Sequence, residues 1–187
     1  MTISNKNDSS TNNVKPSIKS LKHDHKKVKE LFAEFEELHA NKGSNDQKAE
    51  LVNRICKQLT IHTQLEEKIV YPIAREELND MDLMDEADVE HAGAKKLIKE
   101  LLTMDPDDSH YDAKVTVLKE YVEHHVKEEE KYMLPELEKS DIAGEELVEE
   151  VLKFKEKHAT KEETEATMSR SSTKDSTSKS SATKTSK

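Results

Sequence analysis

The sequence predicts an all-α protein: an antiparallel up-down-up-down four-helix bundle with an additional C-terminal helix and disordered termini. The 187 residues include only 3 Gly and 4 Pro, and 37% of them are charged, a composition that favours long amphipathic helices over strands. Apolar residues recur at steps of three and four in four segments. Short breaks between these segments are typical of helices that pack as antiparallel neighbours.

The turn and capping residues between the apolar segments indicate where each helix begins and ends. Pro16 or Ser17 begins the first, and Ser44, Asn45 or Asp46 caps the second. The expected helices are one from Pro16 or Ser17 to about His39, one from the turn "NKGSND" to about Leu78, one from about Leu83 to Thr103, one from the break "MDPDDS" to about Glu138, and a shorter one, "ELVEEVLKFKEKH".

The domain organisation follows from composition. We expect the bundle over 16–140 and the C-terminal helix over 141–159. Residues 1–15 are polar, and in 160–187 Ser or Thr occupies 15 of 28 positions. Neither end can bury enough apolar surface to offset the entropy cost of ordering, so both are expected to be disordered.

Each long helix has one predicted buried face. Every face contains a histidine, and two also contain a glutamate. In helix order the faces are Ile18, Leu21, His25, Val28, Phe32 and Phe35; Leu51, Ile55, Leu59, His62, Glu66, Ile69 and Ile73; Met84, Ala87, His91, Ala94, Ile98 and Leu101; and Val115, Leu118, Val122, His125, Glu129 and Tyr132.

An ionised carboxylate in a bundle core is costly unless it is paired or bound to a metal. Residues four apart lie one turn above each other on the same helix face, so a His and the Glu four residues later can reach one metal or two neighbouring ones. The predicted metal ligands are His25, His62, Glu66, His91, His125 and Glu129. Imidazole and carboxylate ligands without thiolate suit iron, manganese or zinc. Two carboxylates from neighbouring helices can bridge two metals, as in di-iron sites of bundle cores.

A repeated segment supports this set. "HTQLEEKIVYP" begins at His62, and "HVKEEEKYMLP" begins 63 residues later, at His125. His124 and Glu128 offer a competing register, but His125 and Glu129 lie on the apolar face and match the first copy. The chain is therefore interpreted as an internal duplication. The proline that ends each copy predicts a bend or an end of the helix just beyond the site.

Other polar residues receive ordinary interpretations. Glu67 and Glu130 recur in both copies and are assigned to a charged outer face, although a hydrogen bond to a ligating imidazole is an alternative. Tyr71 and Tyr132, which are not equivalent under the repeat, are assigned to packing, with a hydrogen bond near the site as the alternative. The remaining histidines, which are expected to be solvated, are His23, His39, His110 and His158.

Four segments in order resemble the motifs of the hemerythrin superfamily, specifically its HHE cation-binding (hemerythrin-like) domains. They are "LKHDHKKVKELF" around His25, "HTQLEEKIVYP", "EHAGAKKLI" around His91, and "HHVKEEEKYMLP". The resemblance covers about Ile18 to Glu138. It implies a hemerythrin-like four-helix bundle with two iron ions in a non-haem di-iron centre. It also implies roles in O2 binding, iron or oxygen sensing, NO response or peroxide handling.

The sequence departs from the O2-carrying members that it resembles. Those proteins have another His four residues after the third-helix His, where this chain has Lys95. Their fourth-helix motif also ends in Asp, one residue beyond the position of Glu129. The favoured function is therefore binding or sensing of O2, NO or peroxide, or iron handling in stress, rather than reversible O2 carriage.

Two other functional classes stay open. One is a peroxide-dismutating or NO-reducing enzyme, although no general acid or base beyond the ligands, and hence no catalytic residue, is identified. The other is a structural metal-binding interaction module, for which zinc would suit a site with every position filled.

Charge and composition exclude some partners and places. The net charge of −10 argues against nucleic acid and anionic membrane surfaces, because both attract basic proteins. No apolar run approaches the roughly 18 residues of a spanning helix, and the N-terminus has no apolar secretory core. With a single cysteine, Cys56, no intramolecular disulfide can form. The expected location is cytoplasmic, with a small diatomic ligand or peroxide as the partner at the metal.

Overall fold

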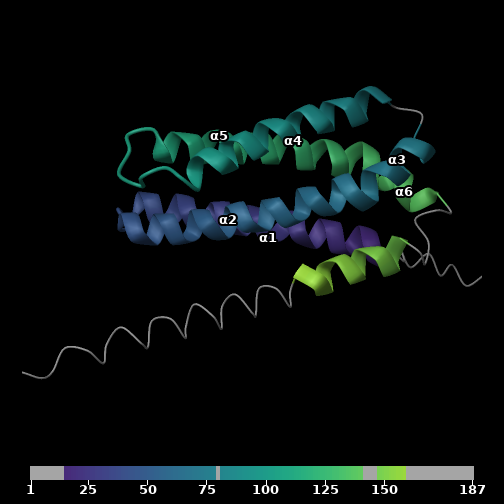
Figure 1. Ribbon diagram of the computed structural model, residues 1–187, viewed down its shortest axis with the longest axis horizontal. Coiled ribbons are helices and arrows are strands. Elements are labelled where there is room, and N and C mark those ends of the chain that lie inside the picture. The colour runs from purple at the N-terminus through teal and green to yellow at the C-terminus, as the bar shows by residue number, and fades with distance from the viewer. Residues whose placement is uncertain (1–14, 79–80, 141–146, 159–187) are drawn as a thin grey trace, which may run out of the picture.

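The computed structural model describes residues 15–78, 81–140 and 147–158. These residues are helical and include no strand, as predicted (Figure 1). The segments expected to be disordered, 1–15 and 160–187, lie outside them except for Lys15, and so does the break at 141–146. The α-helices are α1 (Pro16–Ala40), α2 (Asn45–Leu65), α3 (Tyr71–Glu77), α4 (Met81–Leu101), α5 (Tyr111–Glu128) and α6 (Leu134–Lys139), and a further helix covers residues 147–158.

The helices pack as two pairs. Helix α1 lies beside α2, and α4 lies beside α5, and the two pairs contact each other (Figure 1). Helix 147–158 packs at the end of the bundle where α1 begins and where α3 and α6 lie. Among the described helices, none is long and apolar enough to cross a membrane.

Local sequence explains how the first two helices begin. Pro16 lies in the first turn of α1, where the missing N–H costs no hydrogen bond. Of the three candidate caps of α2, Ser44 takes the position. Its hydroxyl accepts a hydrogen bond from the backbone N–H of Gln47, and the Gln47 side chain accepts one from the Ser44 N–H.

The apolar core consists of two clusters separated by a polar layer. One cluster contains Phe32, Ile55 and Leu118, and the other contains Leu21 and Leu65. In each of α1, α2 and α4, a buried histidine falls between the residues of one cluster and those of the other; on α5, His125 lies at the end of the first cluster, and the second resumes at Met133 in the turn that follows. The polar layer is therefore shielded on both sides by close-packed apolar side chains.

The predicted buried faces of α1 and α4 are correct throughout. Three predicted core positions are wrong: Ile69 and Ile73 are only half-buried, and Tyr132 is exposed. All three follow a predicted ligand glutamate. The side chains that are buried instead are Val70, Tyr71 and Ala74 in the first copy and Met133, Leu134 and Leu137 in the second.

Two π-helical turns explain these errors. They are η1 (Glu66–Val70) and η2 (Glu129–Met133), so each begins at a predicted ligand glutamate. The N–H of Tyr71 donates to the carbonyl of Glu66, five residues back, and the second copy repeats this bond. Because the turn contains one extra residue, the buried positions beyond it lie one residue later in the sequence than the α-helical spacing predicts.

The repeated prolines account for the place of the π-turns. A proline within a helix lacks its N–H, and its ring clashes with the carbonyl four residues earlier. A widened turn just before Pro72 and Pro135 gives each ring room, and the helix continues beyond it as α3 or α6. The prolines therefore mark a change of helix register, and one or two further turns follow, as expected.

Candidate metal centre

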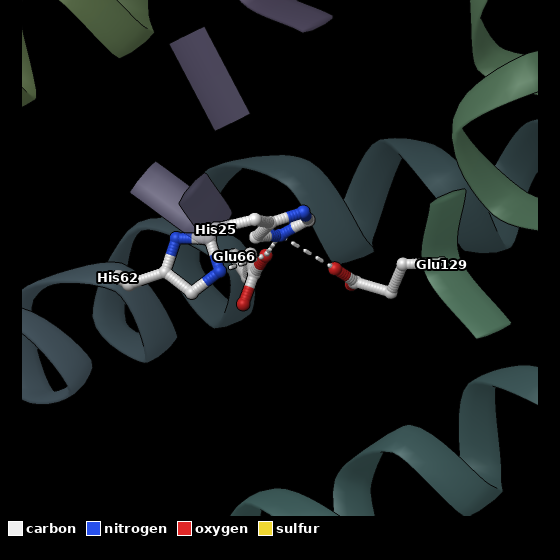
Figure 2. Close-up of side chains that lie close together, drawn as sticks. All are labelled: His25, His62, Glu66 and Glu129. Atoms are coloured by element: carbon white, nitrogen blue, oxygen red, sulfur yellow. Dashed lines mark ion pairs between the residues drawn. The ribbon is translucent and has the colours of Figure 1, made fainter. Parts of the chain in front are cut away.

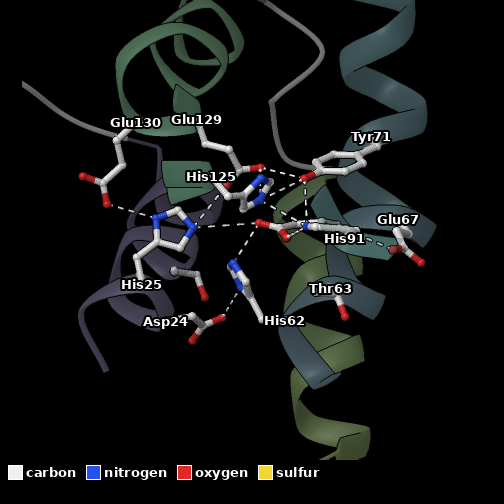
Figure 3. Close-up of polar contacts among 12 residues, drawn as sticks. Asp24, His25, His62, Thr63, Glu67, Tyr71, His91, His125, Glu129 and Glu130 are labelled. Atoms are coloured by element: carbon white, nitrogen blue, oxygen red, sulfur yellow. Dashed lines mark hydrogen bonds and ion pairs between the residues drawn. The ribbon is translucent and has the colours of Figure 1, made fainter. Parts of the chain in front are cut away.

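All six predicted ligands point into the polar layer (Figures 2 and 3). They are His25 on α1, His62 on α2, Glu66 in η1, His91 on α4, His125 on α5 and Glu129 in η2. Each is at most 7% exposed. Positions spread over 105 residues of sequence therefore meet at one depth in the bundle, where one apolar cluster ends and the other begins.

The side chains form two overlapping groups. The first is His25, His62, Glu66 and Glu129, and the second is Glu66, His91 and His125; in each, the potential ligand atoms lie within 4.8 Å of one another. Glu66 belongs to both. Its Oε1 lies 2.9 Å from His62 Nε2, and its Oε2 lies 3.4 Å from His91 Nε2. This carboxylate has the placement required to bridge two metal ions.

Glu129 also links the two halves. Its Oε2 lies 3.2 Å from His25 Nε2, and its Oε1 lies 3.5 Å from His125 Nε2 (Figure 3). The contact with His125 is the longer one, and the same oxygen also accepts a hydrogen bond from Tyr71. The two glutamates are thus similar in position but differ in their surroundings.

The imidazole nitrogens and carboxylate oxygens of the layer suit a bound cation. Among the described residues, six side-chain atoms of the first group are buried without a hydrogen-bond partner: Nε2 of His25, both ring nitrogens of His62, both oxygens of Glu66 and Oε2 of Glu129. Buried polar atoms are nearly always satisfied, and these atoms meet one another as imidazole–carboxylate contacts such as His62 to Glu66 at 2.9 Å, which a cation could satisfy. In the second group, the Nε2 atoms of His91 and His125 lie 3.1 Å apart, a hydrogen-bond distance when one ring carries its proton on Nε2. With both protons on Nδ1, the two Nε2 lone pairs would face each other and could be shared with a cation. These residues could hold a metal.

The pKa values of two buried histidines and of Glu66 show that the layer favours positive charge. Burial by itself would lower the pKa of His62, but Glu66 and Asp24 outweigh it and raise the pKa to about 10. The pKa of His25 rises to about 9 because Glu129 and Glu66 likewise outweigh burial. The pKa of Glu66 lies well below its usual range despite burial, because His62 and His25 stabilise its charge. A metal would replace these protons.

A carboxylate faces the outer nitrogen of each histidine, and Figure 3 shows three of the four: Glu130 at His25, Glu67 at His91 and Asp24 at His62. The Nδ1 contacts are His25 to Glu130 at 2.9 Å, His91 to Glu67 at 3.0 Å, His125 to Glu90 at 2.8 Å and His62 to Asp24 at 3.6 Å. The contacts of His25, His91 and His125 are hydrogen bonds, whereas Nδ1 of His62 has no hydrogen-bond partner among the described residues. An Nδ1–H that donates outward leaves the Nε2 lone pair directed into the layer, which is the tautomer that a metal needs.

The interpretation of Glu67 and Glu130 as a charged outer face is therefore wrong. Each contacts the histidine of the opposite half, Glu67 that of α4 and Glu130 that of α1. Sequence reasoning also missed Asp24 and Glu90. Both directly precede a predicted ligand, and this shared position was the available signal. The outer carboxylates thus obey the same duplication as the inner ligands.

Two lysines extend the duplication further. Lys95 Nζ donates to both carboxylate oxygens of Glu67, and Lys29 Nζ lies 4.0 Å from Glu130 Oε1. Each lysine follows the histidine of its own helix by four residues. Lys95, which marked the departure from O2 carriers, therefore supports the partner of His91 and does not enter the layer.

Tyr71 breaks the duplication. Its hydroxyl donates to Glu129 Oε1 at 2.9 Å and lies 3.2 Å from His91 Nε2 and 3.3 Å from His125 Nε2. Burial and the nearby carboxylates raise its pKa well above the usual range, so the phenol keeps its proton. The equivalent position in the second copy is Leu134. The assignment of Tyr71 to packing is wrong, because the π-turn rotates it into the layer.

Replacing Tyr71 with Phe is expected to lower the free energy of unfolding by about 1–3 kcal/mol in chelator-treated protein, since the buried carboxylate of Glu129 loses its donor. Urea denaturation followed by circular dichroism measures this. Tyr111→Phe is the matched control, because Tyr111 is equally buried but belongs to the other cluster, away from the layer. Equal losses in both variants would contradict a specific role for the Tyr71 hydroxyl.

The remaining histidines lie outside the layer. His124 and Glu128, the competing register, form a separate group with Glu86 in which His124 and Glu86 are exposed. His23, His39 and His110 are exposed, as expected. His158 differs from the expectation, because it is half-buried and its ring N–H donates to the carbonyl of Phe154 at 2.8 Å.

The chain is similar to known proteins over the helices that carry this site. Residues 17–137 match the family described as "Hemerythrin HHE cation binding domain". The chain is also similar to a protein named DNA nickase from Nostoc sp. (strain PCC 7120 / SAG 25.82 / UTEX 2576), with 27% identity over 137 residues. The alignment covers 72% of this chain but 37% of that relative, so the chain spans little more than a third of its length. No solved structure matches the chain significantly.

Proposed function

The chain belongs to the hemerythrin family of HHE cation-binding domains, and we propose that it holds a non-haem di-iron centre in its polar layer. We further propose an antiparallel up-down-up-down topology for the four helices that surround the layer, and a cytoplasmic location. The observation that carries the proposal is the shared position of Glu66 in two buried groups of imidazole donors.

The proposed ligands divide between two ions. His25 and His62 would serve one, and His91 and His125 would serve the other, with Glu66 and Glu129 shared. Imidazole and carboxylate without thiolate are a donor set suited to iron. Four protein ligands per ion leave open positions on octahedral iron, at which O2, NO or peroxide can bind.

The surroundings favour a small ligand. A narrow cavity lies against His91 and His125, and its wall includes the apolar side chains of Leu59, Ala94 and Val126. Tyr71 places a hydroxyl donor near the same two histidines. A narrow, largely apolar space beside two candidate ligands suits a diatomic gas or peroxide better than a large or charged substrate. We therefore propose binding or sensing of O2, NO or peroxide, or iron handling in stress.

Metal analysis combined with absorption spectroscopy tests the proposal. Purified protein loaded anaerobically with Fe2+ is expected to retain two iron ions per chain. Its visible absorption is expected to change on addition of O2, NO or peroxide. Retention of a single ion, or an absorption spectrum that none of the three ligands changes, would contradict it.

Two alternatives predict different results. A peroxide-dismutating or NO-reducing enzyme would turn over its substrate many times per iron centre, and this turnover would disappear in His125→Ala. A structural module would retain Zn2+ in preference to iron and respond to no small ligand. The open positions and the cavity favour the sensing or binding proposal over the structural one.

The name of the Nostoc relative raises action on DNA as a separate candidate. We propose that this chain does not act on nucleic acid, because its net charge of −10 repels the phosphate backbone. Supercoiled plasmid is expected to stay intact with metal-loaded protein under anaerobic conditions. Conversion to the nicked form by this protein but not by Glu66→Gln would contradict the proposal.

A further inference from the structure

Helix 147–158 lies beyond residues 17–137, the part of the chain that matches the family. It nevertheless packs tightly on the bundle. Leu147 and Val151 are each 1% exposed and belong to the apolar cluster that contains Ile18 and Leu21 of α1. The helix is therefore held against α1 directly beside the segment that carries His25 and Asp24.

Lys155 connects this helix to the metal centre. Its Nζ donates to the Oγ of Ser20 and lies 2.6 Å from Oδ2 of Asp24. The same Asp24 oxygen faces Nδ1 of His62 at 3.6 Å. Asp24 is 19% exposed and Lys155 is 26% exposed, so the ion pair is partly shielded from water and less screened than a surface pair.

The other outer carboxylates differ in where their cations come from. Glu67 is paired with Lys95, Glu130 lies near Lys29, and Glu90 lies 3.4 Å from His124. All three of these cationic or titratable partners belong to α1, α4 or α5. Asp24 is paired instead with a lysine of the helix outside the duplicated bundle.

We propose that Lys155 is a positioning residue that holds Asp24 toward His62, so that docking of helix 147–158 sets how firmly the centre retains metal. At 3.6 Å the contact from Asp24 to Nδ1 of His62 is the longest of the four outer contacts and exceeds a hydrogen bond, so it depends on electrostatic attraction and on where Lys155 holds the Asp24 carboxylate. A histidine without its outer acceptor loses both its fixed tautomer and its ring orientation. The inference rests on the proposed metal centre.

Release of Fe2+ to an excess of ferrous chelator under anaerobic conditions tests the role of Lys155. Lys155→Met is expected to release iron about 10-fold faster than the wild type, in line with the known effect of outer partners on metal affinity. Lys155→Arg is expected to restore most of the retention, because it keeps the charge. Lys153→Met is the matched control, since Lys153 is exposed on the same helix and pairs with Glu149 there. It should release iron at the wild-type rate.

A double-mutant cycle separates positioning from a general loss of stability. If Lys155 acts through Asp24, the variant Asp24→Asn/Lys155→Met should release iron no faster than Asp24→Asn alone. The inference would be overturned if the double variant released iron faster than Asp24→Asn by the factor seen for Lys155→Met alone. It would also be overturned if Lys155→Met released iron at the wild-type rate. Wild-type protein that takes up no iron would instead refute the proposed function itself, so the two failures are distinguishable.

Discussion

Replacing Glu66 with Gln is expected to abolish stable metal binding at both positions of the centre. Glu66 lies in both donor groups, it is fully buried, and both of its oxygens lack a hydrogen-bond partner among the described residues. Gln keeps the shape but removes the negative charge and one acceptor oxygen. The loss of affinity should therefore exceed the roughly 10- to 100-fold caused by changing an outer partner.

Isothermal titration with Fe2+ under anaerobic conditions measures the effect, and circular dichroism shows whether the variant is folded. Two variants serve as controls of graded severity. Glu129→Gln also removes a carboxylate that the two proposed ions would share, but Glu129 belongs to only one of the two close groups and its Oε1 already accepts a hydrogen bond from Tyr71, so it should weaken binding less. Glu67→Gln changes only the outer partner of His91 and should have the smallest effect. Tight binding of two ions by Glu66→Gln would refute the bridging role of Glu66.

Removal of the metal is expected to lower the melting temperature by roughly 10 °C. A ligand that binds only the native state at about 1,000 times its dissociation constant adds about 4 kcal/mol to the free energy of unfolding. A change of 1 kcal/mol shifts the melting temperature of a chain of this size by about 2–4 °C. The chelated protein should stay helical, because the two apolar clusters lie on either side of the layer and do not depend on the metal.

Differential scanning calorimetry of the iron-loaded protein, with and without chelator, provides this measurement. Glu66→Gln is the control, since a protein without a metal site should melt at one temperature in both conditions. Identical melting of the wild type with and without chelator would show that no metal supports the fold.

The accuracy of the sequence predictions depends on how local the responsible interactions are. The buried faces of α1 and α4 are correct along their whole length, because steps of three and four along one helix decide them. On the other two helices the predictions fail only after Glu66 and Glu129. There a π-turn inserts one position, and no local pattern of apolar residues shows that insertion.

The same distinction between local and long-range interactions applies to the candidate metal centre. Spacing within single helices and the 63-residue repeat identified all six inner residues, and the structure brings all six into one layer, although their binding of metal stays a prediction. The repeat also contained Glu67 and Glu130. It could not show that their side chains turn inward toward the histidines of the opposite half, because that depends on how two helices are rotated against each other.

By itself, the sequence determined the all-helical class, the long helices, most of the core and the six residues that meet in the polar layer. These follow from periodicity and from the cost of burying charge, and both can be evaluated along one helix. Only the tertiary structure decided that Tyr71 enters the layer and that Lys155 reaches Asp24 from helix 147–158. Both contacts join residues of different helices, and their geometry depends on the π-turns and on how the helices pack.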